Sequence, residues 1–237
     1  MRILAVDTSS ASCSVGLLFK GRLMAEATSE KKETHSRHLM SLIHAVFEMA
    51  GERCNEVDLL AVVTGPGSFT GIRIGVSTVQ GLAMALSKPV ESVSSLEALA
   101  IQALPSPYAV CPILDARRGE VYMALYRYEN QHLKQIRKDC VISPQRLLAS
   151  IDEPCYFIGS GAQIYGELIQ KKMGGNAVLA GRWLSKIRAE TVGRIALKKN
   201  KARQLKKSKS QVPHYIRPSD AELSAEKNRK SNDSQQS

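Results

Sequence analysis

A glycine-rich run at residues 65–73 holds the residue types in this sequence that are best suited to chemistry. It reads GPGSFTGIR, follows an apolar segment at 59–63, and precedes a helical pattern at 72–86. A strand, a glycine turn and a helix start gather free backbone N–H groups at one point, which suits a bound anion. The run therefore predicts either a phosphate site or unusually close backbone packing.

The spacing of the run fits neither common nucleotide fingerprint. A P-loop ends in Gly-Lys-Ser/Thr, but here Gly71 is followed by Ile and Arg. A dinucleotide-binding loop has its third glycine at the position that Thr70 occupies here. In one interpretation a phosphate binds at the helix N-terminus with Arg73 as its counter-ion. In the other, Gly71 and Gly75 leave one helix face nearly bare for a neighbouring element. The second is favoured, because each helical glycine costs roughly 0.5–1 kcal/mol relative to alanine and close packing would offset that cost.

The strands and helices that must position this run follow one another in the same order in both halves of the chain. Antiparallel strands come first, and a strand, a glycine turn and a helix follow. In the first half we expect strands at 2–6, 12–19, 23–29, 58–64 and 90–93, with helices at 36–50, 72–86 and 95–103. In the second half we expect strands at 108–114, 121–128, 133–142 and 156–158, with helices from 143, from 161 to 173, and at 183–199.

The boundaries between the expected units lie at two changes of composition. A segment with two prolines, 104–107, is the best linker, and the last residues are rich in Ser, Lys, Glu and Asn. We therefore predict an N-terminal lobe at 1–103, a C-terminal lobe at 104–206 whose last helix can pack back on the first lobe, and a basic, mostly disordered tail at 207–237. Duplicated mixed α/β sheets with a cleft between them are typical of actin-like ATPases and sugar kinases.

The composition indicates a soluble cytoplasmic protein. Of 237 residues, 43% are hydrophobic and 23% are charged, which is ordinary for a folded domain. The apolar stretches look too short for a membrane span, and Asp7 comes too early for a signal peptide. Five scattered cysteines without a Cys-x-x-Cys pair favour reduced thiols over disulfides or zinc.

Five motifs resemble those of one family, the bacterial TsaB proteins. Together they span residues 3 to 217, and the glycine run is the most specific of them. They are Ile3-Leu-Ala-Val-Asp7-Thr-Ser9, His35-Ser-x-His38-Leu, the run from Gly65 to Gly75, Leu114-Asp-Ala-Arg117-x-x-Glu120-Val-Tyr122, and Pro213-x-Tyr215-x-Arg217.

The resemblance implies a two-lobed actin-like fold of the ribonuclease H-like class and an accessory role in tRNA modification. TsaB is a non-catalytic paralogue of TsaD. It acts together with TsaD and the ATPase TsaE. This group of proteins attaches threonylcarbamoyl to N6 of the adenosine next to the anticodon, in tRNAs that read codons beginning with A. TsaB also self-associates as a homodimer. The alternative is a free-standing actin-like ATPase or kinase that uses Asp7 and the glycine turns.

The resemblance makes the predicted nucleotide cleft a degenerate one. In active members of the actin-like superfamily a glycine commonly follows the first aspartate by two residues, and here that position is Ser9. We expect no intrinsic cofactor, with ATP bound at most at a composite site shared with partners. The residues of the degenerate phosphate site are Asp7, Thr8, Gly65, Gly67, Ser68, Thr70 and Arg73.

Two surfaces are predicted for partners. The apolar stripe of the first helix and the small face of the second either pack on the sheet or meet a partner, and the resemblance favours TsaD and a second copy in competition. The interface residues are Leu39, Leu42, Ile43, Val46, Gly71, Gly75, Thr78 and Val79. A basic patch could contact tRNA phosphates or be a solvated helix end. It comprises Lys198, Lys199, Lys201, Arg203, Lys206 and Lys207.

No metal site is expected. His35, His38 and His44 lie within ten residues, but His38 and His44 are six apart and fall on different faces of a helix. Surface or capping roles are therefore the better interpretation of these histidines.

Overall fold

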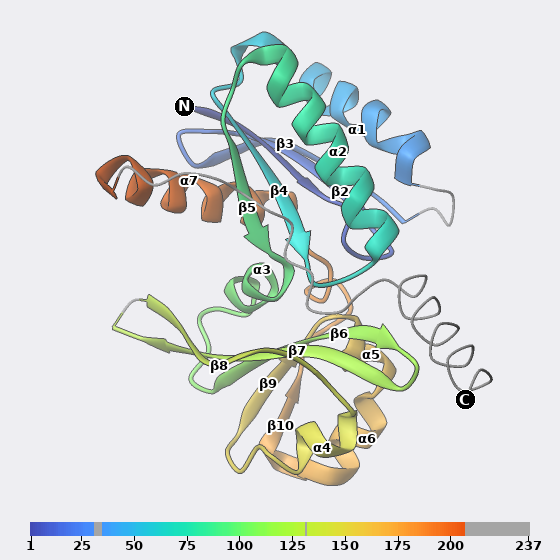
Figure 1. The fold of residues 1–237 in the computed structure, drawn as a ribbon. Helices are drawn as coiled ribbons and strands as arrows, with labels where there is room; N and C mark the ends of the chain where they lie inside the picture. Colours follow the sequence, from blue (N-terminus) through green and yellow to red (C-terminus); the bar gives the residue numbers. More distant parts are fainter. Residues whose placement is uncertain (31–34, 131, 207–237) are drawn as a thin grey trace, which may run out of the picture.

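The computed structural model describes residues 1–30, 35–130 and 132–206, which form two lobes. Each lobe is built on one five-stranded sheet (Figure 1). In the first sheet the spatial order is β3-β2-β1-β4-β5. Its strands are β1 (Arg2–Asp7), β2 (Cys13–Phe19), β3 (Arg22–Ser29), β4 (Leu59–Gly65) and β5 (Val90–Ser94). β1, β2 and β3 pair antiparallel, whereas β1, β4 and β5 run parallel.

The second sheet repeats this topology, with the order β10-β9-β6-β7-β8. Its strands are β6 (Ala109–Arg117), β7 (Glu120–Glu129), β8 (His132–Ile142), β9 (Cys155–Ile158) and β10 (Ala177–Leu179). β6, β7 and β8 are antiparallel, and β6, β9 and β10 are parallel. The duplication confirms the predicted two-lobed α/β fold with mixed sheets.

Helices cover both faces of the first sheet. The helices of the described residues are α1 (His35–Ala50), α2 (Phe69–Leu86), α3 (Ser95–Gln102), α4 (Pro144–Leu148), α5 (Ser160–Ile164), α6 (Gly166–Met173) and α7 (Ala189–Lys206), with short 3-10 helices η1 (Cys54–Glu56) and η2 (Gly174–Asn176). Figure 1 shows the sheet between α7 on one side and α1 and α2 on the other.

Alternation along β1 explains this layering. Successive side chains of a strand point to opposite faces. Leu4 and Val6 therefore pack in the apolar cluster that contains α1 and α2. Ile3 and Ala5 pack in the other cluster, which contains Ile195 of α7. Both faces of β1 are covered, so its near-continuous apolar sequence is what the fold requires.

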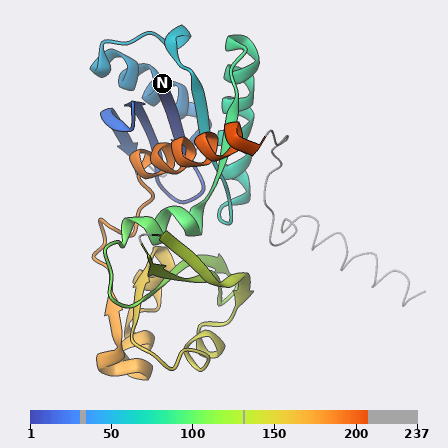
Figure 2. The ribbon, with the colours of Figure 1, turned by 90° about the vertical axis from the view of Figure 1, so that its left-hand side faces the viewer.

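A continuous core joins the two lobes through α3. Leu96 and Leu99 of α3 are fully buried, and they belong to the same cluster as Val63 of the first sheet and Val110 of the second. In Figures 1 and 2 this helix lies between the two sheets. The lobes therefore share apolar packing as well as two chain crossings.

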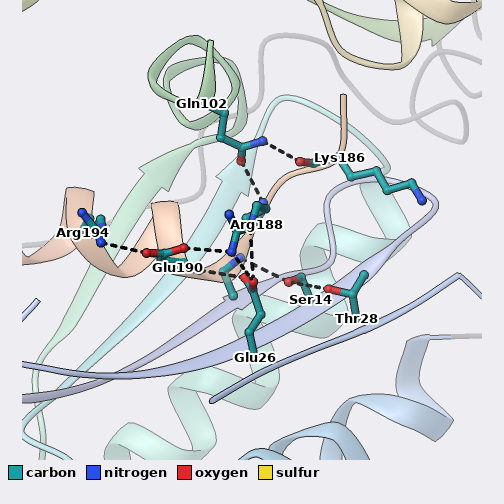
Figure 3. A network of polar contacts seen from close by, with 9 residues as sticks. Ser14, Glu26, Thr28, Gln102, Lys186, Arg188, Glu190 and Arg194 are labelled. Atoms are coloured by element: carbon teal, nitrogen blue, oxygen red, sulfur yellow. Dashed lines mark hydrogen bonds and ion pairs between the residues drawn. The ribbon is translucent and has the colours of Figure 1, made fainter. Parts of the chain in front are cut away.

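Gln102, the last residue of α3, ties the two crossings together (Figure 3). Its Nε2 donates hydrogen bonds to the carbonyls of Leu184, at 3.1 Å, and Lys186, at 2.7 Å. Its Oε1 accepts a hydrogen bond from the backbone N–H of Arg188, at 2.8 Å. One side chain thus holds three backbone groups of the segment that returns to the first lobe.

The first lobe also fixes the start of α7 (Figure 3). Glu26 of β3 accepts a hydrogen bond from the backbone N–H of Glu190 at 2.9 Å, and Ser14 of β2 accepts one from Ala189 at 3.2 Å. A carboxylate at a helix N-terminus is favourable. These bonds place the helix start at Ala189, so the predicted start at 183 is wrong, and residues 181–188 form the returning turn.

Candidate functional site

The turn between β4 and α2 is filled by the chain's own backbone. Gly67, with φ +155°, lies so close to Ser9 that a Cβ there would be 2.2 Å from the Ser9 carbonyl oxygen. The same oxygen accepts a hydrogen bond from the backbone N–H of Ser68 at 2.7 Å. An anion at a helix N-terminus would need that donor and that space. The Ser9 carbonyl therefore stands where a phosphate oxygen would bind.

Other polar groups of the turn are also satisfied locally. The Ser68 hydroxyl caps α2 by accepting a hydrogen bond from Gly71 N at 3.2 Å. The backbone carbonyl of Ser68 accepts another from Ile72 N at 2.8 Å. Behind the turn, the buried Ser95 hydroxyl donates to the Pro66 carbonyl. This geometry favours close packing over phosphate binding.

The bare face of α2 packs against the residue that follows β1. Thr8 is fully buried, and its Oγ1 donates a hydrogen bond to the Gly71 carbonyl at 2.7 Å. A Cβ added to Gly75 would lie 2.2 Å from the same Oγ1. Gly71 and Gly75 therefore serve a contact inside the chain, which corrects their predicted place in a partner interface.

Asp7 is sealed in the same region. Its side chain is 0% exposed, and its Oδ1 accepts hydrogen bonds from Ser9 N at 2.9 Å and Ser9 Oγ at 2.6 Å. Its Oδ2 is buried and has no hydrogen-bond partner among the described residues. Burial raises the pKa of Asp7 to about 6, although the bonds from Ser9 act in the opposite direction. Neither oxygen is open to a magnesium-bound water in this arrangement.

Arg73 and Thr70 do not complete a phosphate site. The Arg73 guanidinium stacks over the ring of Phe69, 3.8 Å from its centroid. Thr70 is exposed at the surface of the helix. Arg73 thus packs on its own helix, and within the described part of the chain no hydrogen bond links it to Gly65 or Gly67.

Most of the predicted helix interface faces the core of the same chain. Leu39, Ile43, Val46 and Val79 are at most 3% exposed and belong to the cluster between the two helices and the sheet. Leu42 and Thr78 are only partly buried. The prediction is wrong for the buried members because their stripe contacts the sheet.

The outward faces of α1 and α2 carry a different set of apolar side chains. Met40, Met49 and Met84 are 52%, 58% and 82% exposed. By length and composition α2 could cross a membrane, which the sequence reading did not anticipate. Its inner face packs on β4 and β1, however, as in the core helix of a folded domain.

The predicted basic patch is only partly available. Lys198 and Lys201 are exposed on α7. Lys199 is not, because its Nζ pairs with Glu97 of α3 at 2.6 Å. The side chains of Arg203 and Lys206, all of Lys207, and the predicted tail lie outside the described residues.

In the described part of the chain no three His, Cys, Asp or Glu side chains lie close enough together to hold a metal ion. His44 pairs instead with Glu48 one turn further along α1, at 3.3 Å.

Sequence reasoning missed two residues of the joint between the lobes. Gln102 belongs to no motif, so nothing in the sequence points to its three backbone contacts. Trp183 was expected inside a helix, yet it is 81% exposed in the returning turn. The sequence did hold one signal for Trp183, because it is the single tryptophan of the chain.

Similar proteins decide the family. A family model described as TsaD, tRNA N6-adenosine threonylcarbamoyltransferase, matches residues 22–225. The tRNA threonylcarbamoyladenosine biosynthesis protein TsaB of Bacillus subtilis is 34% identical over an alignment that covers 73% of this chain and 77% of that protein. The chain belongs to the TsaB family. The TsaB of Haemophilus influenzae is 31% identical, with 75% of this chain and 80% of that protein covered.

A solved structure extends the TsaB likeness to both lobes. YeaZ from Pseudomonas aeruginosa has a TM-score of 0.70 and 30% sequence identity, and it covers 87% of this chain and 95% of its own. The resemblance to TsaB that the five motifs indicate is thus confirmed.

Proposed function

We propose that this chain is a non-catalytic scaffold and activator subunit of the machinery that adds threonylcarbamoyl to N6 of the adenosine next to the anticodon in tRNAs reading ANN codons. It acts in the cytoplasm by binding TsaD and TsaE. One observation carries the proposal: in a chain whose relatives are named as proteins of this pathway, the Ser9 carbonyl occupies the anion position at α2.

The filled turn supports the absence of intrinsic catalysis. A nucleotide would have to displace Ser9 from Ser68, and Asp7 has no oxygen open to a metal-bound water. ATP is therefore bound, if at all, at a composite site shared with partners. The tRNA is reached through those partners or through the basic segment 198–209.

The outward faces of α1 and α2 are the docking surface in this proposal. Met40, Met49 and Met84 expose flexible apolar side chains there, and such side chains adapt to a partner surface. A second copy of the chain and TsaD compete for this surface, so the homodimer dissociates when TsaD binds.

Reconstitution with purified TsaD, TsaE, tRNA, ATP and a preformed, activated threonylcarbamoyl donor tests the proposal. The chain alone should neither hydrolyse ATP nor modify tRNA, and its addition to the partners should restore modification. Met84→Lys should weaken association on size-exclusion chromatography while the melting temperature stays the same. Tyr128→Lys, at a 40% exposed position on β7, is the matched control.

Two results would contradict the proposal. Full modification by TsaD and TsaE without this chain would remove its role as activator. ATP turnover by the chain alone, lost in Asp7→Asn, would support the free-standing ATPase or kinase instead.

A further inference from the structure

The turn that returns the chain to the first lobe exposes a large aromatic side chain. Residues 181–184 are all exposed, and Trp183 and Leu184 keep 81% and 43% of their surface open. An indole left in water is unfavourable by its apolar area. A tryptophan that keeps this much of its surface in water is therefore a candidate for a binding role, provided that the turn itself is ordered.

Contacts from both lobes order the turn. Gln102 of α3 binds the carbonyls of Leu184 and Lys186. From the second lobe, Gln163 of α5 donates to the Ala180 carbonyl at 3.0 Å, and the backbone N–H of Gly159 donates to Ser185 Oγ at 3.2 Å. The residues on both sides of Trp183 are thus fixed, and its exposure does not come from a loose loop.

The indole itself is also oriented. Lys186 Nζ lies 4.3 Å from the centroid of the Trp183 ring, and such a cation is attracted to the electron-rich face of the ring. Lys186 is in turn ion-paired with Glu30. The ring is therefore held at one face by an anchored cation, which lowers the entropy lost when a ligand stacks on it.

The residue that precedes the indole in the chain is a cation. Arg182 is exposed and has no ion-pair partner among the described residues. The second lobe meets the turn where Gly159 N donates to Ser185 Oγ, and the neighbouring Ser160 Oγ accepts a hydrogen bond from Asp115 N of the β6–β7 hairpin.

We propose that Trp183 is a stacking platform for an unpaired base of an RNA, with Arg182 contacting the adjoining phosphate. The inference rests on the proposed function in one respect, that the RNA is the tRNA substrate. Aromatic rings accept any base by its π-face, and neighbouring cations supply the backbone contact. Exposed Ile164 of α5 and Leu184 of the turn itself would suit a protein partner. A purely apolar contact would, however, leave Arg182 and the oriented ring without a use.

Because Trp183 is the only tryptophan, its fluorescence reports on this position alone. The full chain is titrated with an unmodified tRNA transcript, a single-stranded oligonucleotide and a duplex of equal length. The tRNA and the single strand should quench the emission, and the duplex should quench it much less. In anisotropy measurements with labelled tRNA, Trp183→Ala should weaken binding roughly 10-fold, and Trp183→Phe should retain most of the affinity.

Two further variants separate the roles of the neighbours. Arg182→Ala should reduce the slope of log K against log salt concentration for tRNA binding by about 1, the change expected when one phosphate contact is lost. Tyr128→Ala, which removes an exposed aromatic outside the turn, should leave affinity and quenching unchanged.

The outcomes are distinct for the two proposals. Unchanged fluorescence on adding tRNA, with an unaltered affinity in Trp183→Ala, overturns the stacking platform. A fluorescence change with TsaD or TsaE but not with RNA assigns the turn to a protein partner and also overturns it. If wild-type chain restores modification in the reconstituted system but tRNA leaves Trp183 unaffected, only this inference fails. If tRNA quenches Trp183 while modification is not restored, only the proposed function fails.

Discussion

The first strand of each lobe carries an aspartate in the same local turn, but the two carboxylates have opposite environments. Asp7 Oδ1 accepts a hydrogen bond from Ser9 N, and Asp115 Oδ1 accepts one from Arg117 N, both at 2.9 Å and both two residues along the chain. Asp7 is completely buried, whereas Asp115 is exposed. The backbone hydrogen bond that the two aspartates share therefore does not decide burial.

Whether the aspartate is buried depends on where the glycine turn contacts the chain that follows or forms the first strand. In the first lobe Gly67 packs on Ser9, beyond the aspartate, and closes over it. In the second lobe a Cβ on Gly159 would lie 2.4 Å from the carbonyl of Ile113, which precedes Asp115. The same sheet topology thus produces a sealed carboxylate in one lobe and an open one in the other.

The largest loss of stability is expected when a methyl group is added to the glycine of either turn. Gly67→Ala and Gly159→Ala would each force a Cβ against a backbone carbonyl at positive φ. Each should lower the free energy of unfolding by about 3 kcal/mol in urea denaturation. Gly81→Ala on α2, where nothing lies within 4 Å, should instead stabilise by about 0.5–1 kcal/mol. Equal effects at all three positions would contradict the packing account.

Asp7→Asn tests the sealed carboxylate through pH. The pKa of Asp7 rises from 3.8 to about 6 on folding, so the folded state favours the neutral acid. The contribution of Asp7 to stability should therefore be largest below pH 4, fall between pH 4 and 6 as the unfolded chain ionises first, and level off above. This loss amounts to about 3 kcal/mol. Chemical denaturation across pH should show it in the wild type and not in Asp7→Asn.

The joint between the lobes should depend more on the first lobe than on the second. Gln102→Ala removes three hydrogen bonds to the returning turn, whereas Gln163→Ala removes two. Gln102→Ala should cost about 1 kcal/mol, because these bonds are partly exposed. Hydrogen exchange at Arg188 should quicken by roughly 5-fold. A larger effect of Gln163→Ala would reverse this assignment.

The smallest effect is expected at the open aspartate. Asp115→Asn keeps the side-chain oxygen that accepts from Arg117 N, and the position is exposed. Its free energy of unfolding should stay within about 0.5 kcal/mol of the wild type at any pH from 4 to 7. A pH-dependent change as large as that of Asp7→Asn would remove the distinction between the lobes.

The sequence predicted the duplication and every strand of the described residues except β10, because buried parallel strands require continuous apolar runs. It missed β10, which is only three residues long. It predicted the β4–α2 turn because glycine, proline and a serine cap are local signals. It also pointed to Ser9 as a departure from the glycine that active actin-like members have at this position. Local pattern could not show that the Ser9 carbonyl takes the Ser68 N–H, because that bond joins residues far apart in the chain.

The partner surface was misplaced for a related reason. An apolar stripe such as Leu39, Ile43 and Val46 has the same periodicity whether it faces a sheet or another protein. Only the packing of α1 on the first sheet separates the two cases. Trp183 escaped notice because the helix expected to contain it starts six residues later, where Ser14 and Glu26 receive its first N–H groups.

The position of α7 has a consequence for synthesis on the ribosome. The first lobe's own strands are complete by Ser94, yet the helix that covers Ile3 and Leu18 ends at Lys206. At about 5–20 residues per second, the intervening stretch takes on the order of 5–20 s to translate. During that interval the nascent first lobe presents one uncovered apolar sheet face, the kind of surface that is prone to aggregate and that chaperones shield.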